Sequence, residues 1–141
     1  MRWDRLFEDL EDQLASEWEA ERAALDSEAE RLRLSRVTLR ERLITLTERA
    51  TTLRLWLPGG TALRGTIAAV GADFVALRPE DCPDGITIVP LGAVQGCALE
   101  HADLLRSARG AAPAGRSPLA DRVTLGYVLR DAARRRGVLR V

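Results

Sequence analysis

The chain has 141 residues and no net charge, because 21 basic residues balance 21 acidic ones. That length is enough for one domain with a modest core, or for a small domain with appendages. The sequence has no apolar run long enough to span a membrane and no signal-peptide pattern, so we expect a cytoplasmic protein with no membrane partner.

The basic residues are unusual in type and in distribution. All 21 are arginine, and lysine and asparagine are absent, which is typical of a GC-rich bacterial genome. Residues 1–30 hold eleven acids against three arginines, whereas residues 102–141 hold nine arginines against three acids. The sequence therefore predicts an acidic head and a basic tail.

Residues 1–36 are predicted to form one long amphipathic helix. Apolar side chains recur at helical spacing, acids fill the other face, and no Gly or Pro interrupts the segment. A small domain cannot cover so long a stripe, so we expect a partner: another copy of the chain, the arginine-rich tail, or a different protein. The residues predicted to make this contact are Trp3, Phe7, Leu10, Leu14 and Trp18.

Residues 37–101 are predicted to form a small β-barrel preceded by a short helix. Thr38 and Glu41 have the spacing of a capping box, which begins the helix. Apolar and polar residues then alternate in five short runs bounded by Gly, Pro and Asp, a pattern typical of half-buried strands. These runs are residues 52–57, 61–70, 73–78, 86–91 and 96–100. Five strands in so short a segment favour a closed barrel, and the fold class is therefore α+β with a helical tail.

The remainder is predicted to be a linker, residues 102–118, followed by a helix and a short strand, residues 119–141. A shift of 86 positions superimposes Arg36-Val-Thr-Leu39 on Arg122-Val-Thr-Leu125. Residues 122–141 thus look like the helix and first strand of a second barrel. Either the chain is a truncated form of a two-barrel protein, or the strand at residues 138–141 pairs elsewhere.

The segment Gly60-Thr-Ala-Leu-Arg-Gly-Thr-Ile-Ala-Ala-Val70, followed by Phe74-Val-Ala-Leu77 and Ile88-Val-Pro-Leu91, carries a family resemblance. With the helix before it, this pattern resembles the Sm-like barrel of Sm proteins and of the bacterial Hfq RNA chaperone. The resemblance implies assembly into rings or dimers through the edge strands. It also makes Asp73 the candidate for the acidic residue with which Sm proteins contact a base.

Two groups of residues are candidates for nucleic-acid contact. Strand alternation places Arg54 and Trp56 on the outer face beside Arg64, which suits base stacking with phosphate contacts. The alternative is that Trp56 packs under the N-terminal helix while the arginines extend to solvent. The second group could bind phosphate or could form a solvated helix end; its residues are Arg134, Arg135 and Arg136.

The sequence shows no catalytic, cofactor or metal motif. Cys82, Cys97 and His101 are too few and too widely spaced for a zinc site, and His101 has no nucleophile at a recognised spacing. We expect Cys97 to be a small core residue, and we expect no enzyme activity and no cofactor.

Together these features predict a non-enzymatic, self-associating adaptor or assembly module. It is expected to be a homo-oligomer that also binds a protein partner through its N-terminal helix. The alternative is a protein that binds single-stranded RNA or another nucleic acid in the manner of Sm and Hfq proteins.

Overall fold

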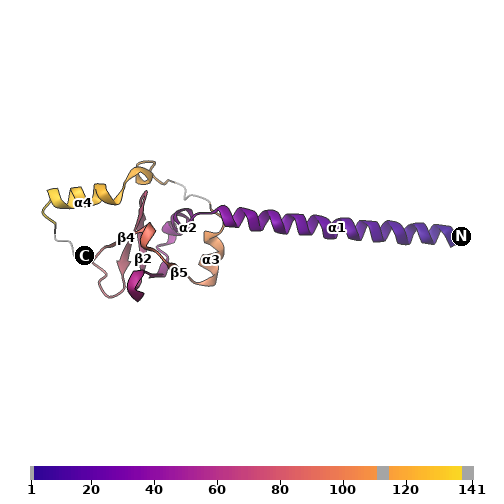
Figure 1. Ribbon diagram of the computed structural model, residues 1–141, viewed down its shortest axis with the longest axis horizontal. Helices are drawn as coiled ribbons and strands as arrows, with labels where there is room; N and C mark the ends of the chain where they lie inside the picture. The colour runs from indigo at the N-terminus through magenta and orange to yellow at the C-terminus, as the bar shows by residue number, and fades with distance from the viewer. Residues whose placement is uncertain (1, 111–114, 138–141) are drawn as a thin grey trace. The chain divides into compact units, whose positions relative to one another are not determined.

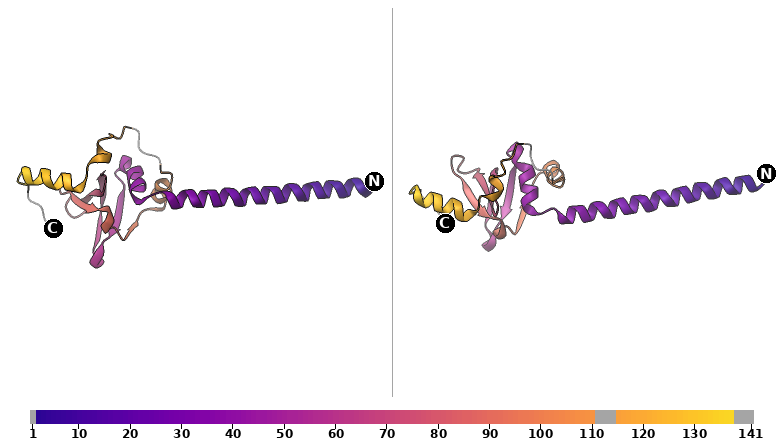
Figure 2. Two further views of the ribbon diagram at one scale, coloured as in Figure 1. Left: turned by 45° about the horizontal axis from the view of Figure 1, so that its top comes forward. Right: turned by 90° about the horizontal axis from the view of Figure 1, so that it is seen from above.

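The computed structural model describes residues 2–110 and 115–137, which divide into two compact units, Met1–Arg36 and Val37–Val141. The first unit is a single helix, α1 (Arg2–Arg36), which is unbroken in Figures 1 and 2. Ion pairs between Arg31 and Glu28 and between Arg33 and Glu30 span one turn near its end. Each helix of the described residues is either too short or too polar to span a lipid bilayer.

The second unit begins with α2 (Leu39–Leu46), whose start confirms the predicted capping box. The Thr38 hydroxyl accepts a hydrogen bond from the Glu41 amide at 3.2 Å, and the Glu41 carboxylate accepts one from the Thr38 amide at 2.7 Å. The hydrogen bonds that the Thr38 amide and hydroxyl donate lower the pKa of the Glu41 carboxyl. The box fixes where α2 begins, so its Leu43 and Leu46 side chains face the sheet.

Five antiparallel strands follow α2 and confirm the α+β fold class. They are β1 (Thr52–Trp56), β2 (Ala62–Val70), β3 (Phe74–Pro79), β4 (Thr87–Pro90) and β5 (Gly96–Ala98). Their order across the sheet is β4-β3-β2-β1-β5, and the described pairings leave β4 and β5 as edges. The expectation of a closed barrel is therefore wrong: the sheet is open, because the two edge strands are short and each pairs with one neighbour only.

Burial alternates along β1, where Leu53 and Leu55 are buried and Thr52, Arg54 and Trp56 are exposed. The alternation expected along β2 fails near its end, because a β-bulge shifts the register with β3 between Ile67 and Ala69. Ala69, which strict alternation from Ile67 would place toward the core, is consequently exposed, and Val70 is buried in its place.

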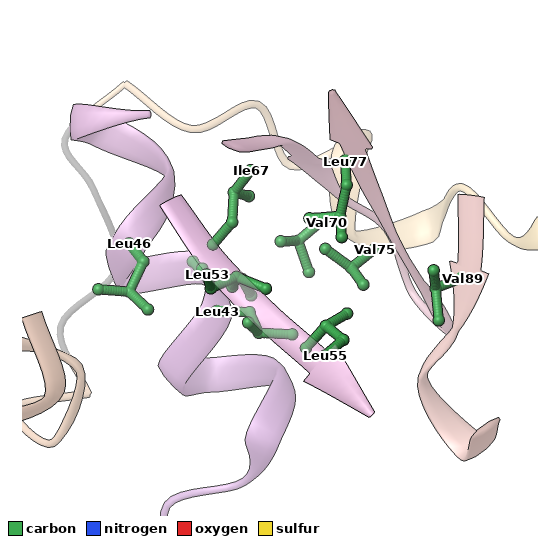
Figure 3. Packing of buried hydrophobic residues seen from close by; sticks show 10 residues of the cluster. Leu43, Leu46, Leu53, Leu55, Ile67, Val70, Val75, Leu77 and Val89 are labelled. Atoms are coloured by element: carbon green, nitrogen blue, oxygen red, sulfur yellow. The ribbon is translucent and has the colours of Figure 1, made fainter. Parts of the chain in front are cut away.

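The core lies between α2 and the inner face of the sheet. Figure 3 shows leucines of α2 and β1 pointing toward aliphatic side chains of β2, β3 and β4. The members of this cluster are Leu43, Ile44, Leu46, Leu53, Leu55, Ile67, Val70, Val75, Leu77 and Val89. This cluster contains no aromatic ring, although Phe74 on β3 is also buried.

The segment after the sheet contains more structure than a linker. The helix α3 (His101–Ser107) occupies the start of the predicted linker and contacts α2. A single 3-10 turn (Ala120–Arg122) then leads into α4 (Leu125–Arg134). The predicted strand at residues 138–141 lies outside the described residues.

Candidate interaction surfaces

The first surface is the apolar stripe of α1, which we define as Trp3, Phe7, Leu10, Leu14 and Trp18. Every one of these side chains is exposed, and the indoles of Trp3 and Trp18 are 69% and 71% accessible. Exposed apolar area on this scale, on one helix face, makes the stripe a candidate docking surface.

The second surface is the outer face of β1 and its neighbours. Trp56 is 40% exposed on this face, and its cross-strand neighbours are Ala62 on β2 and Gly96 on β5. Because both neighbours are small, neither strand covers the indole with a large side chain. The exposed part of the ring could stack on a base.

Arg54 lies two residues from Trp56 and directly opposite Arg64. Arg64 pairs with Glu80 at 2.9 Å, whereas no carboxylate of the described residues pairs with Arg54. Two like charges opposite each other on a sheet destabilise it. An anion bound beside Arg54 would relieve this repulsion. The three predicted residues Arg54, Trp56 and Arg64 thus share one face.

An open groove continues this face toward the start of α3. Its lining includes Arg49, Arg54, Arg64 and Arg106. Arg106 is held in place, since it donates a hydrogen bond to the Thr51 hydroxyl at 2.7 Å and pairs with Asp103 at 3.0 Å. The groove therefore combines a fixed cation with the guanidinium groups of Arg49 and Arg54, which form no ion pair within the described part of the chain. The carboxylates of Glu100 and Asp103 also line it. Sequence reasoning missed Arg49 and Arg106, which the fold brings here from outside the strands.

The predicted tail residues Arg134, Arg135 and Arg136 do not line this groove. They are exposed at the end of α4, where Arg135 pairs with Asp131 at 2.8 Å. Cations at this end of a helix interact favourably with its dipole. The structure thus separates the two groups of candidate nucleic-acid residues.

The third surface is the turn between β2 and β3, residues 70–73, which holds the tail. Arg116 donates to the Val70 carbonyl at 2.7 Å, and the Ala72 amide donates to the Val123 carbonyl at 2.8 Å. The Leu125 amide donates to Asp73 Oδ1 at 2.7 Å. Asp73 therefore caps the start of α4, a contact that its interpretation as a base-binding residue did not predict.

Two guanidinium groups secure the same contact through Asp121. Arg40 donates to the Gly71 carbonyl at 2.7 Å and to Asp121 Oδ1 at 2.6 Å. Arg116 donates to the same carboxylate oxygen at 3.0 Å. These bonds, the one from Arg40 first, hold the pKa of the Asp121 carboxyl below its usual range.

We expect the tail to leave the turn in acid because of Asp121. A carboxyl whose pKa is lower in the folded state contributes stability above its unfolded pKa of about 3.9. That contribution to stability is lost as the pH falls through the lower pKa that Asp121 has in the folded state. An NMR titration should show the Ala72 and Leu125 amide resonances moving together in this range. Asp121→Asn should weaken the contact between the tail and the β2–β3 turn at neutral pH, and it should remove this titration step. An unchanged step would mean that another group titrates.

The two cysteines do not form part of a metal site in the described residues. Cys82 and Cys97 are both free and exposed, and the described residues contain no cluster of three His, Cys, Asp or Glu side chains that could hold a metal ion. The expectation that Cys97 is a core residue is wrong, because β5 is an edge strand and leaves this side chain uncovered.

Comparison with known proteins adds no family to this description. No protein-family model matches the chain, and the search of curated proteins found no match.

Proposed function

We propose that this protein is a non-enzymatic assembly module that self-associates through the apolar stripe of α1. The exposure of the stripe is the observation that carries the proposal. Each large apolar side chain that becomes fully buried contributes roughly 1.5–3 kcal/mol. Five such side chains from each copy are enough to drive association after its entropic cost.

The spacing within the stripe favours a second copy as the partner. From Trp3 to Trp18 the steps are four, three, four and four residues, so the pattern is nearly the same in both directions. An antiparallel copy places Trp18 near Trp3 and Leu14 near Phe7. A parallel pair in register would instead bury Glu21 against Glu21 of its partner, which repels. The antiparallel arrangement leaves Glu21 beyond the end of the paired segment.

Tryptophan emission tests this proposal. In Trp56→Phe, Trp3 and Trp18 are the only indoles, because the chain has three tryptophans. Self-association would bury both of them, so the emission should shift to longer wavelength as the protein is diluted. Emission of fully solvated indole at every concentration would contradict the proposal.

We also propose that the protein is cytoplasmic. Two exposed thiols that form no disulfide support a reducing compartment.

A second function, binding of single-stranded nucleic acid, is favoured by the outer face of β1. There the open indole of Trp56 lies beside Arg54, and the groove adds Arg49 and Arg106. Aromatic stacking with backbone cations is how proteins hold single strands without reading their sequence. This function would make the assembly a multivalent binder, since each copy contributes one such face.

Fluorescence anisotropy of a labelled single-stranded RNA tests the second function. We expect affinity that falls steeply with salt, because arginines displace counterions from phosphate. Trp56→Ala should weaken binding by about tenfold or more, since stacking contributes about 1–3 kcal/mol per base. Trp56→Phe keeps a ring and should retain most of the affinity. Absence of binding at low salt would remove this function.

A further inference from the structure

The two helices that follow an Arg-Val-Thr-Leu sequence begin in the same way. Thr38 is the N-cap of α2 and Thr124 is the N-cap of α4, and each side chain accepts from the amide three residues on. The offset is 86 residues in both cases, as the sequence repeat requires. The tail therefore repeats the start of the second unit in structure as well as in sequence.

The two helix starts differ in how their remaining backbone groups are satisfied. Glu41 completes the capping box of α2, whereas α4 has Tyr127 at the equivalent position. In α4 the turn between β2 and β3 binds two other groups: Asp73 accepts from the Leu125 amide, and the Ala72 amide donates to the Val123 carbonyl. The turn thus recognises the backbone of an Arg-Val-Thr-Leu helix start, with a donor and an acceptor at fixed positions.

The equivalent groups of α2 are the Val37 carbonyl and the Leu39 amide. Neither has a hydrogen-bond partner among the described residues, and both residues are partly exposed. A second copy of the chain could therefore present to the turn the same tetrapeptide, with the same two groups unpaired.

We propose that the β2–β3 turn is a docking site for this helix start. Residues 122–125 fill it within one chain, and residues 36–39 of a second copy fill it when the tail leaves. The tail is then an internal competitor that limits head-to-tail assembly of the second unit. This contact uses the β2–β3 turn and not the apolar stripe of α1. It is therefore a second mode of association, in addition to the one proposed above.

The test uses a full-length chain with Phe7→Glu and Leu14→Glu, which removes assembly through α1. Adding Leu125→Pro and Asp121→Ala opens the turn. Proline is tolerated at the first position of a helix but lacks the amide that Asp73 binds. Sedimentation velocity should show a mass that rises with concentration for this open variant and stays at one chain for its parent. Association of the parent itself would instead count against the proposed role of the stripe.

Asp73→Ala in the open variant is the matched control, and it should return the mass to that of one chain. An open variant that remains a single chain at all concentrations, or association that survives Asp73→Ala, would overturn the proposal.

A second measurement leaves the tail unmodified, so misfolding of a tail variant cannot affect its result. A peptide of residues 34–47, added in excess to the Phe7→Glu, Leu14→Glu chain, should displace the tail and move the Ala72 and Leu125 amide resonances. The same peptide with Leu39→Pro should leave them in place. If the unmodified peptide causes no change at saturation, the turn does not accept this segment.

Discussion

Phe7→Glu with Leu14→Glu is expected to dissociate the assembly into single chains. Both side chains lie on the apolar stripe of α1 and are exposed in the isolated helix. In the proposed assembly, each substitution would remove an apolar contact and bring a carboxylate into a desolvated interface. We expect the dissociation constant to rise at least a hundredfold, which corresponds to about 2.7 kcal/mol. Light scattering during size-exclusion chromatography measures the change in mass directly.

The control for this experiment is Ser16→Glu with Ala23→Glu. These positions lie on the face of α1 opposite the stripe, and the double variant adds the same two charges. It should keep the mass of the unmodified protein. Equal loss of mass in both double variants would mean that added charge, rather than loss of the stripe, drives dissociation.

Gly65→Ala is expected to have the largest effect on the stability of the second unit. Gly65 is buried in β2 between β1 and β3, where it pairs with Leu53 and Pro79. A Cβ at this position would lie 2.5 Å from the Arg78 carbonyl oxygen and 3.2 Å from the Pro79 Cα. Both are backbone atoms, so a strand must move. We expect the free energy of unfolding, measured in urea, to fall by about 1–3 kcal/mol or more.

Gly92→Ala is the matched control for this prediction. Gly92 is exposed, its backbone does not have a positive φ, and a Cβ there would meet no atom within 4 Å. Its free energy of unfolding should change by less than about 0.5 kcal/mol. Similar losses in the two variants would mean that close packing at Gly65 is not what excludes a side chain.

The parts of the fold that depend on local pattern could be predicted from the sequence. The absence of Gly and Pro predicted the unbroken helix α1, and the Thr38 and Glu41 pair predicted where α2 begins. Alternation predicted the strands and the outward placement of Arg54 and Trp56. Each of these signals involves residues only a few positions apart, so the sequence contains all of the relevant chemistry.

The parts that depend on distant contacts were predicted less well. The bulge that exposes Ala69 carries no glycine to signal it, because its cause is the pairing of β2 with β3. Whether β4 and β5 meet to close a barrel likewise depends on both edges of the sheet. The contact of Asp73 with Leu125 joins residues 52 positions apart, so the sequence could suggest a loop carboxylate but not its partner.

The candidate surfaces divide in the same way. The sequence was sufficient to select the five residues of the apolar stripe and to place Arg54 and Trp56 on one strand face. It could not select Arg49 and Arg106, because the turn after α2 and the helix α3 bring them to the groove only in the folded unit.

The most direct test of self-association through α1 is sedimentation equilibrium of the unmodified protein over a range of concentrations. One chain has a mass of 15.5 kDa. A mass of two or more chains, falling toward one chain on dilution, is the result we predict. A mass of one chain at every concentration would contradict the account and leave the exposed stripe without the partner proposed for it.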